Sequence, residues 1–354
     1  MLIMNNILER KGPIIKVIGG IPKGHIEKIE QNILRSSTGE ETLTSLSEKD
    51  KKEIKKLEYP KSSEEIGIID FANREINKMM TRSGIKSRDF PHDNILILPP
   101  ELYRKAVGED TDGSAVQLDQ VMVLDAELTR DNPPFFGKLV FHEMMHLKSV
   151  FVLEAQKAVE EGLFDVSERR GGLKIKSSQK KNREGHSHEH FRGLNEAIIA
   201  SEEKEFLDNL MREKMFIKYR KWLGSQAFLE MKNKKAQELG IDKDEILFID
   251  QDGKNLVKTN YPKQREVYSY VLSEIEGEFP EEYRSISELK EEFTKSLFTG
   301  KLLKIARLTE ATFGKGSFRA LGIMGKDDNS AIQVLEMLRN MRTQKLSDKH
   351  NKRK

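Results

Sequence analysis

The residues with the clearest chemical potential are two histidines that lie four positions apart. They belong to the stretch His142-Glu143-Met144-Met145-His146. On a helix this spacing puts both imidazoles on one face, close enough to share one metal ion. Glu143 then lies beside that face, where its carboxylate reaches a metal-bound water without being a ligand. Zinc lowers the pKa of such a water toward about 7, and the carboxylate takes the proton as the water attacks a carbonyl.

The flanking residues indicate that this helix is buried. Leu139, Val140 and Phe141 precede the motif, and Leu147 follows it. Ionisable groups rarely lie in such a helix without a partner. The chain has 8 histidines in 354 residues, so about 0.02 occurrences of the pattern are expected by chance. The alternative is a pair of hydrogen-bonded core histidines with a surface glutamate, and the sequence leaves that alternative open.

A zinc site needs at least one more protein ligand. The long form of the motif would place glycine at position 149 and histidine at position 152. The sequence has Ser149 and Val152 instead, so that form is excluded. A carboxylate does occur later, at Glu196, near the start of an apolar stretch with helical spacing. The residues alone make Glu196 a candidate for the third ligand.

Two other segments hold potential ligands. His186, His188 and His190 alternate in a polar loop beside a glycine. They could bind a metal, or one of them could donate to an oxyanion, but the composition favours a solvated loop. His190 is the best of the three because it lies closest to Glu196. Asp165 is a further rival, although its predicted hairpin favours a surface position.

On these residues the chain resembles the gluzincin group of zinc metallopeptidases over roughly residues 66–275. These enzymes pair a His-Glu-x-x-His helix with a glutamate ligand on a later helix, often in an Asn-Glu context. The resemblance implies that His142, His146 and Glu196 bind one zinc ion per chain and that Glu143 is the general base. It also implies an α+β fold with a zincin-like core, in which a small mixed sheet packs on the active-site helix. The chain is most similar to the small soluble members of the group.

The resemblance has one departure and two further implications. Thermolysin-like members carry an acidic residue one turn after the ligand glutamate to orient a histidine, but here that position is Ala200, so the group must come from elsewhere. In such enzymes an edge strand binds the substrate backbone, and the strand at 121–125 is our candidate. A tyrosine commonly steadies the tetrahedral intermediate. Tyr261 is the candidate, because Tyr268 and Tyr270 look more like core residues.

Composition excludes several other classes of protein. The chain has no cysteine, which rules out disulfides, thiol nucleophiles and cysteine-based metal sites and fits a reducing compartment. It has 61 basic and 58 acidic residues, for a net charge of +3. Nucleic acid is therefore not an expected partner. No segment reaches the roughly 18–20 apolar residues of a membrane span, and the N-terminus lacks the pattern of a secretory signal. We expect a cytoplasmic protein without a membrane partner.

The patterning predicts four regions. They are an N-terminal extension with a charged linker (1–63), a zincin-like core (64–276), a mainly helical C-terminal region (277–344) and a frayed basic tail (345–354). Hydrophobic spacing predicts strands at 94–98, 114–118 and 121–125, and a hairpin in 163–176 that turns at Gly171–Gly172. It predicts helices at 64–84, 133–162, 225–239, 262–276, 286–298, 300–312 and 330–343, and another from about Leu194. Residues 36–63 read equally well as a linker or as a solvated helix.

Taken together, the sequence predicts zinc-dependent hydrolysis of a peptide or protein substrate. Two rivals belong to other classes. One is a regulatory zincin that cleaves a single cytoplasmic protein, such as a repressor, and no generic peptide. The other is a non-catalytic binding protein that keeps the zinc fold, in which Glu143 would be replaceable without loss.

Overall fold

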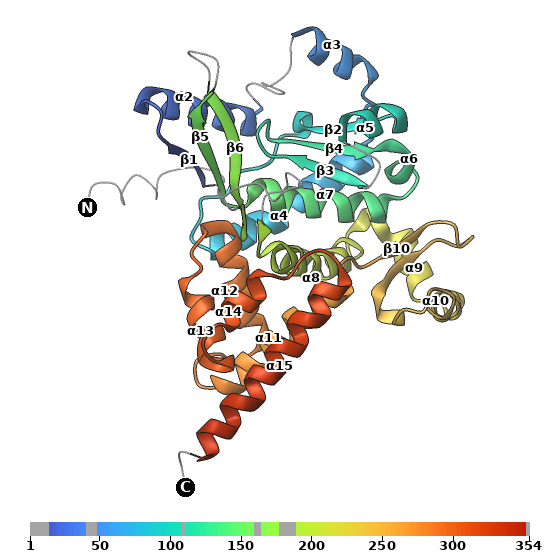
Figure 1. The fold of residues 1–354 in the computed structure, drawn as a ribbon. Coiled ribbons are helices and arrows are strands. Elements are labelled where there is room, and N and C mark those ends of the chain that lie inside the picture. The colour runs from blue at the N-terminus through green and yellow to red at the C-terminus, as the bar shows by residue number, and fades with distance from the viewer. Residues whose placement is uncertain (1–13, 40–47, 108–110, 159–163, 177–188, 352–354) are drawn as a thin grey trace.

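The computed structural model describes residues 14–39, 48–107, 111–158, 164–176 and 189–351. Two mixed sheets lie toward one end of the molecule, long helices cross its middle, and the C-terminal helices fill the other end (Figure 1). Strands and helices are not arranged as regular βαβ units, so the fold is of the α+β class. The predicted α+β class is therefore confirmed.

Helix α7 (Pro133–Lys148) carries both histidines of the motif and crosses the middle of the molecule (Figure 1). It begins after Asn132, whose side chain accepts a hydrogen bond from the backbone N–H of Phe135 at 3.2 Å. It ends at Ser149, whose hydroxyl donates to the carbonyl of Met145 at 2.7 Å. Nearly all of its side chains are buried, as expected of a helix that is apolar on most of its faces.

A three-stranded sheet packs on α7. It consists of β2 (Ile95–Leu98), β3 (Gly113–Val116) and β4 (Val121–Asp125), in the spatial order β2-β4-β3. β4 pairs in parallel with β2 and antiparallel with β3. Our choice of residues 121–125 as the edge strand was therefore wrong. All five residues of β4 are buried, as a strand with a partner on each side requires. Within the described residues, β2 and β3 are the edge strands of this sheet.

A second sheet has the order β1-β5-β6-β7-β8. Its strands are β1 (Ile15–Gly19), β5 (Phe151–Lys157), β6 (Phe164–Gly171), β7 (Lys174–Lys176) and β8 (Glu189–His190). The predicted continuation of the motif helix to residue 162 is wrong, because β5 occupies 151–157. Its first residues are buried alternately, the period of a strand, and β1 pairs with it in parallel. The hairpin predicted for 163–176 is confirmed, with Gly172 at φ +61° in the turn.

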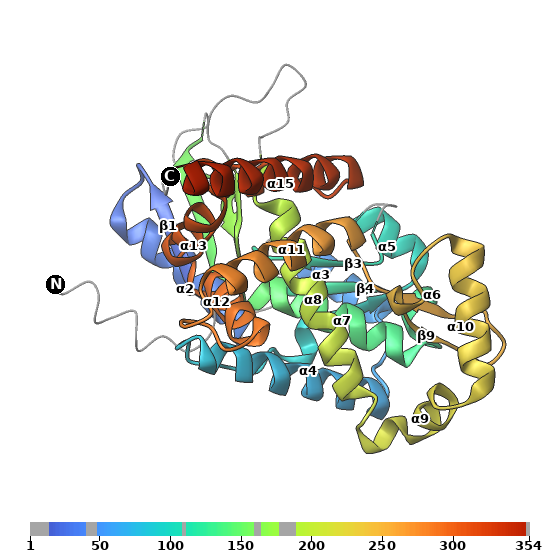
Figure 2. The same ribbon diagram turned by 90° about the horizontal axis from the view of Figure 1, so that it is seen from below.

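Four helices build the layer beneath the sheets. α4 (Ser63–Arg82) and α8 (Arg192–Leu210) both pack on α7 and contact each other, and α11 (Pro262–Glu278) packs on α8 (Figure 2). A capping box begins α4, in which the Ser62 hydroxyl accepts from the N–H of Glu65. The other helices are α2 (Lys23–Ser37), α3 (Glu48–Leu57), α5 (Pro100–Val107), α6 (Ala126–Thr129), α9 (Ile217–Leu223), α10 (Gln226–Leu239), α12 (Ile286–Thr299), α13 (Leu303–Phe313), α14 (Ser317–Gly322) and α15 (Asp328–Asn351).

Other parts of the chain also differ from the patterning. The basic tail expected from residue 345 is helical as far as Asn351, because α15 packs on α11 and Arg342 forms ion pairs with Glu274 and Glu278 there. The hairpin of β9 (Ile246–Ile249) and β10 (Leu256–Lys258) was not predicted. Of the proposed linker, residues 48–57 form α3, whereas residues 40–47 lie outside the described ranges.

One apolar core joins the helices of the predicted core region to those of the C-terminal region. It runs from Ile68 on α4 through Phe141 on α7 and Ile198 on α8 to Leu338 on α15. Burial of apolar side chains in such a core is the main favourable contribution to the free energy of folding. No helix within the described ranges is both long and apolar enough to cross a membrane.

Candidate metal centre

His142 and His146 lie one turn apart on α7 and face each other. Their Nε2 atoms are 3.1 Å apart and their ring centroids 4.8 Å apart. The His142 side chain is 9% exposed and that of His146 18% exposed, so His146 is the more accessible of the two. Two imidazole nitrogens at this distance can share a proton or bind one cation.

Glu196 reaches the same point from α8. Its Oε2 atom lies 3.4 Å from His142 Nε2 and 3.5 Å from His146 Nε2. The preceding residue, Asn195, is also used structurally, because its Oδ1 accepts a hydrogen bond from the backbone N–H of Leu173 in the turn after β6. The Asn-Glu pair therefore fixes α8 against the hairpin and brings a carboxylate to the two imidazoles.

The three atoms form a triangle with edges of 3.1, 3.4 and 3.5 Å. In a tetrahedral zinc site with bonds of about 2.0–2.1 Å, neighbouring ligands are about 3.3–3.4 Å apart. The triangle thus has the size of one face of such a tetrahedron. Among the described residues, Glu196 Oε2 is also buried without a hydrogen-bond partner, and a buried carboxylate oxygen without a donor is costly. The residues fit a zinc ion on both counts.

The rival ligands do not join this cluster. Asp165 is exposed on β6, and His190 is exposed on β8. The group of histidines and carboxylates close enough for a metal consists of His142, His146 and Glu196 within the described ranges. His186 and His188 lie outside those ranges.

Glu203 supplies the orienting carboxylate that Ala200 cannot provide. It lies on α8 two turns after Glu196, is fully buried, and its Oε1 accepts a hydrogen bond from His142 Nδ1. That contact directs Nε2 of the same ring toward the centre of the triangle. Its other oxygen is 3.9 Å from the buried ammonium of Lys138. Glu203 could not be predicted from the resemblance, which implies an orienting carboxylate one turn after Glu196, because Glu203 lies two turns after it.

The electrostatics follow from this burial. Burial disfavours a charged imidazole, but the carboxylates of Glu203 and Glu196 raise the pKa of His142 well above its ordinary value. Burial likewise disfavours a charged carboxylate, yet His146, His142 and then Lys326 hold the pKa of Glu196 well below its ordinary value. The centre therefore keeps an ionised carboxylate beside an imidazole that binds a proton tightly, and a bound cation would take the place of that proton.

Tyr261 lies beside the histidines, as the resemblance implied. Its ring centroid is 6.5 Å from that of His142. Its backbone is left-handed, with φ at +54°, and Pro262 follows it at the start of α11. Lys138 holds the strained segment by donating to the carbonyl of Lys258 and to Oδ1 of Asn260, each at 2.8 Å. Burial and the nearby Glu196 raise the pKa of Tyr261 strongly, so its hydroxyl stays protonated as a donor.

The other two tyrosines are structural. Tyr268 is fully buried and packs on Phe293, with ring centroids 5.4 Å apart. Tyr270 packs on Phe313 of α13 at 5.7 Å. Both belong to the core or its border, as their sequence context indicated.

An open cleft of about 870 Å³ leads to this centre. The edge strand β3 forms one wall, and the cleft floor includes His142, His146, Glu143 and Glu196. Gly113 of β3 lies against Glu143, since a Cβ atom there would be 3.5 Å from Cγ of Glu143. β3 pairs on one side only within the described ranges, and an edge strand beside a carboxylate and a set of metal-binding side chains is suited to binding an extended chain. None of the described residues before α4 lines this cleft.

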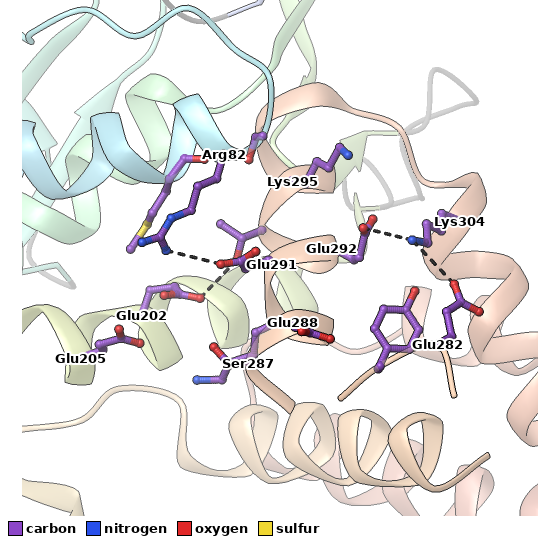
Figure 3. A pocket seen from close by; sticks show the side chains of 15 residues that line it. Arg82, Glu202, Glu205, Glu282, Ser287, Glu288, Glu291, Glu292, Lys295 and Lys304 are labelled. Atoms are coloured by element: carbon purple, nitrogen blue, oxygen red, sulfur yellow. Dashed lines mark hydrogen bonds and ion pairs between the residues drawn. The ribbon is translucent and has the colours of Figure 1, made fainter. Parts of the chain in front are cut away.

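A second cavity, of about 350 Å³, lies among α4, α8 and α12 (Figure 3). It is rich in glutamates, but cations from the same walls pair with several of them. Arg82 contacts Glu291 at 3.4 Å, and Lys304 contacts Glu292 at 3.0 Å. Glu202 is buried and accepts a hydrogen bond from Thr294 at 3.1 Å. These contacts are typical of a structural charge network between packed helices.

Comparison with known proteins gave no match: no family model, no curated protein and no solved structure is significantly similar to this chain.

Proposed function

We propose that this chain is a zinc-dependent metallopeptidase with a zincin-like core formed by α7, α8 and the sheet of β2, β4 and β3. The observation that carries the proposal is the convergence of His142, His146 and Glu196 in a triangle of tetrahedral size. Two further features support it. Glu203 orients one imidazole from behind, and Glu143 lies beside the triangle in the cleft.

The proposed chemistry divides between the metal and the side chains. Zinc, when bound, supplies a Lewis acid that polarises a carbonyl and acidifies water. Glu143 takes the proton of the attacking water and later gives it to the leaving amine, the role that its place beside the triangle suits. Glu203 holds His142 in the tautomer that keeps Nε2 free.

Two further groups act on the substrate in this proposal. The Tyr261 hydroxyl donates a hydrogen bond to the oxygen that gains negative charge as the carbonyl is attacked. Its raised pKa keeps that proton in place at neutral pH. The edge strand β3 (Gly113–Val116) pairs with the substrate main chain as an added strand. The substrate is thus an extended segment of a peptide or protein. The absence of cysteine fits a reducing compartment, so we place the enzyme in the cytoplasm.

The test separates the metal from the base. Protein purified without chelators should contain about one zinc per chain by elemental analysis. His142→Ala should lose the zinc. Glu143→Gln should keep it, while cleavage of a general protein substrate such as casein should fall by about 10²–10⁴-fold. A wild type free of zinc, or a Glu143→Gln variant that cleaves at the wild-type rate, would contradict the proposal.

A third outcome would point to the rivals. Wild type that holds zinc but cleaves no generic substrate would be a regulatory zincin with one protein target or a non-catalytic binding protein. Glu143→Gln then distinguishes the two in the source cell, because only the first loses its function.

A further inference from the structure

The segment 323–327 links α14 to α15 and lies against the start of α8. Two backbone hydrogen bonds hold it there. The N–H of Phe191 donates to the carbonyl of Gly322, and the N–H of Gly193 donates to the carbonyl of Met324, each at 2.8 Å. Helix α8 has no side-chain N-cap, so these carbonyls take the place of a capping side chain.

The fit between the 323–327 segment and α8 is close. A Cβ atom on Gly193 would lie 2.3 Å from the carbonyl oxygen of Gly325, so only glycine allows this approach. The buried side chain of Gln264 on α11 donates to the carbonyls of Gly325 and Asp327, at 3.2 and 3.0 Å. The segment is thereby fixed to two helices at once.

This fixed segment carries Lys326 to the metal centre. Its Nζ atom lies 3.4 Å from Oε1 of Glu196 and 5.5 Å from the ring centroid of Tyr261. The two oxygens of Glu196 thus have different surroundings. Oε1 faces the ammonium, whereas Oε2 faces the two imidazoles and accepts no hydrogen bond within the part of the chain that the structure describes.

We propose that Lys326 is a positioning residue that holds Oε1 of Glu196 and thereby presents Oε2 alone to the metal. This inference rests on the proposed zinc site and adds a role for the C-terminal region. A carboxylate that rotates freely can bind a cation through one oxygen or both, and an ion pair to one oxygen fixes that choice. Partners of this kind typically account for 10–100-fold in metal affinity.

A competing effect has the opposite sign. The Lys326 ammonium and a divalent cation repel each other, so the charge alone would weaken binding. The Lys326 side chain is 39% exposed, and solvent screens the repulsion at such a site. The direct contact with Glu196 is short and is made to a buried carboxylate, so we expect the positioning effect to dominate.

The experiment measures zinc affinity by competition with a chromophoric chelator. Lys326→Met keeps the aliphatic length and removes the charge, and its dissociation constant for zinc should rise about tenfold. Lys326→Arg should restore most of the affinity. Lys315→Met, which changes an exposed lysine just before α14, is the matched control. The absorption spectrum of the Co²⁺-substituted protein gives a second readout, because a second carboxylate oxygen raises the coordination number and weakens the visible bands.

Each outcome decides the matter. Unchanged affinity and spectrum in Lys326→Met, or tighter binding, would overturn the positioning role while leaving the zinc site intact. If neither wild type nor Lys315→Met binds zinc, the proposed function itself fails and the inference falls with it.

Discussion

The contact between Glu203 and His142 allows a quantitative prediction. The acceptor is a carboxylate with a fully buried side chain, so the hydrogen bond is charge-assisted and unscreened. Hydrogen bonds to charged groups contribute about 1.5–3 kcal/mol, and neutral ones about 0.5–1.5 kcal/mol. Glu203→Gln keeps the shape and exchanges the first kind for the second, a loss of about 1–1.5 kcal/mol. Zinc affinity should fall about tenfold, because 1.4 kcal/mol corresponds to a factor of ten.

Glu203→Ala removes the acceptor altogether and should cost up to about 100-fold in zinc affinity, the upper end for groups that orient a ligand. The assay is chelator competition at neutral pH, with far-ultraviolet circular dichroism to verify the helices. Glu205→Gln changes an exposed carboxylate on the same helix and is the control. Wild-type affinity in both Glu203 variants would refute the idea that this carboxylate orients His142.

Three further predictions test other parts of the site and fold. Glu196→Ala should weaken zinc binding by more than about 100-fold, which exceeds the effect of losing an orienting group. Asp165→Ala and His190→Ala should bind zinc as wild type does. If a chelator titration gave the reverse pattern, Asp165 or His190 would be the third ligand. Tyr261→Phe should lower kcat about 100-fold with zinc content unchanged, and equal peptidase rates would remove the tyrosine from the mechanism. Burial raises the pKa of the Glu202 carboxyl. The folded state therefore binds the carboxyl proton more tightly than the unfolded chain does. As pH rises above the ordinary carboxyl range, ionisation of Glu202 destabilises the fold. Glu202→Gln should therefore raise the thermal midpoint at pH 7 and lose that advantage near pH 4, and a pH-independent difference would contradict this reasoning.

The local features of the metal helix could be predicted from sequence because they depend on neighbouring residues. Asn132, the prolines at 133 and 134 and the apolar run around the motif set where α7 begins and what it buries. The facing of His142 and His146 follows from helix geometry alone. Helix geometry alone could not place Glu196, because its position depends on how α8 crosses α7. Its choice as third ligand came from the resemblance to the gluzincins.

The remaining parts depend on contacts that no local pattern records. The sequence after Ser149 continues the apolar composition of α7, and only pairing with β1 and β6 makes residues 151–157 a strand. The order β2-β4-β3 is likewise a matter of tertiary pairing, so the edge strand was assigned to the wrong segment. Glu203 lies a full two turns beyond Glu196, a spacing that becomes meaningful only once His142 is known to lie opposite.

The docking of the 323–327 segment on α8 has a consequence for biosynthesis. The ribosome makes the ligand-bearing helices first and the segment that caps α8 more than 100 residues later. Until Met324 has emerged, the first amide groups of α8 lack their carbonyl partners and Glu196 lacks its cation. A nascent or truncated chain therefore carries the ligand residues without the finished centre. In a peptidase this order of assembly would lower zinc affinity until residues 323–327 have been made.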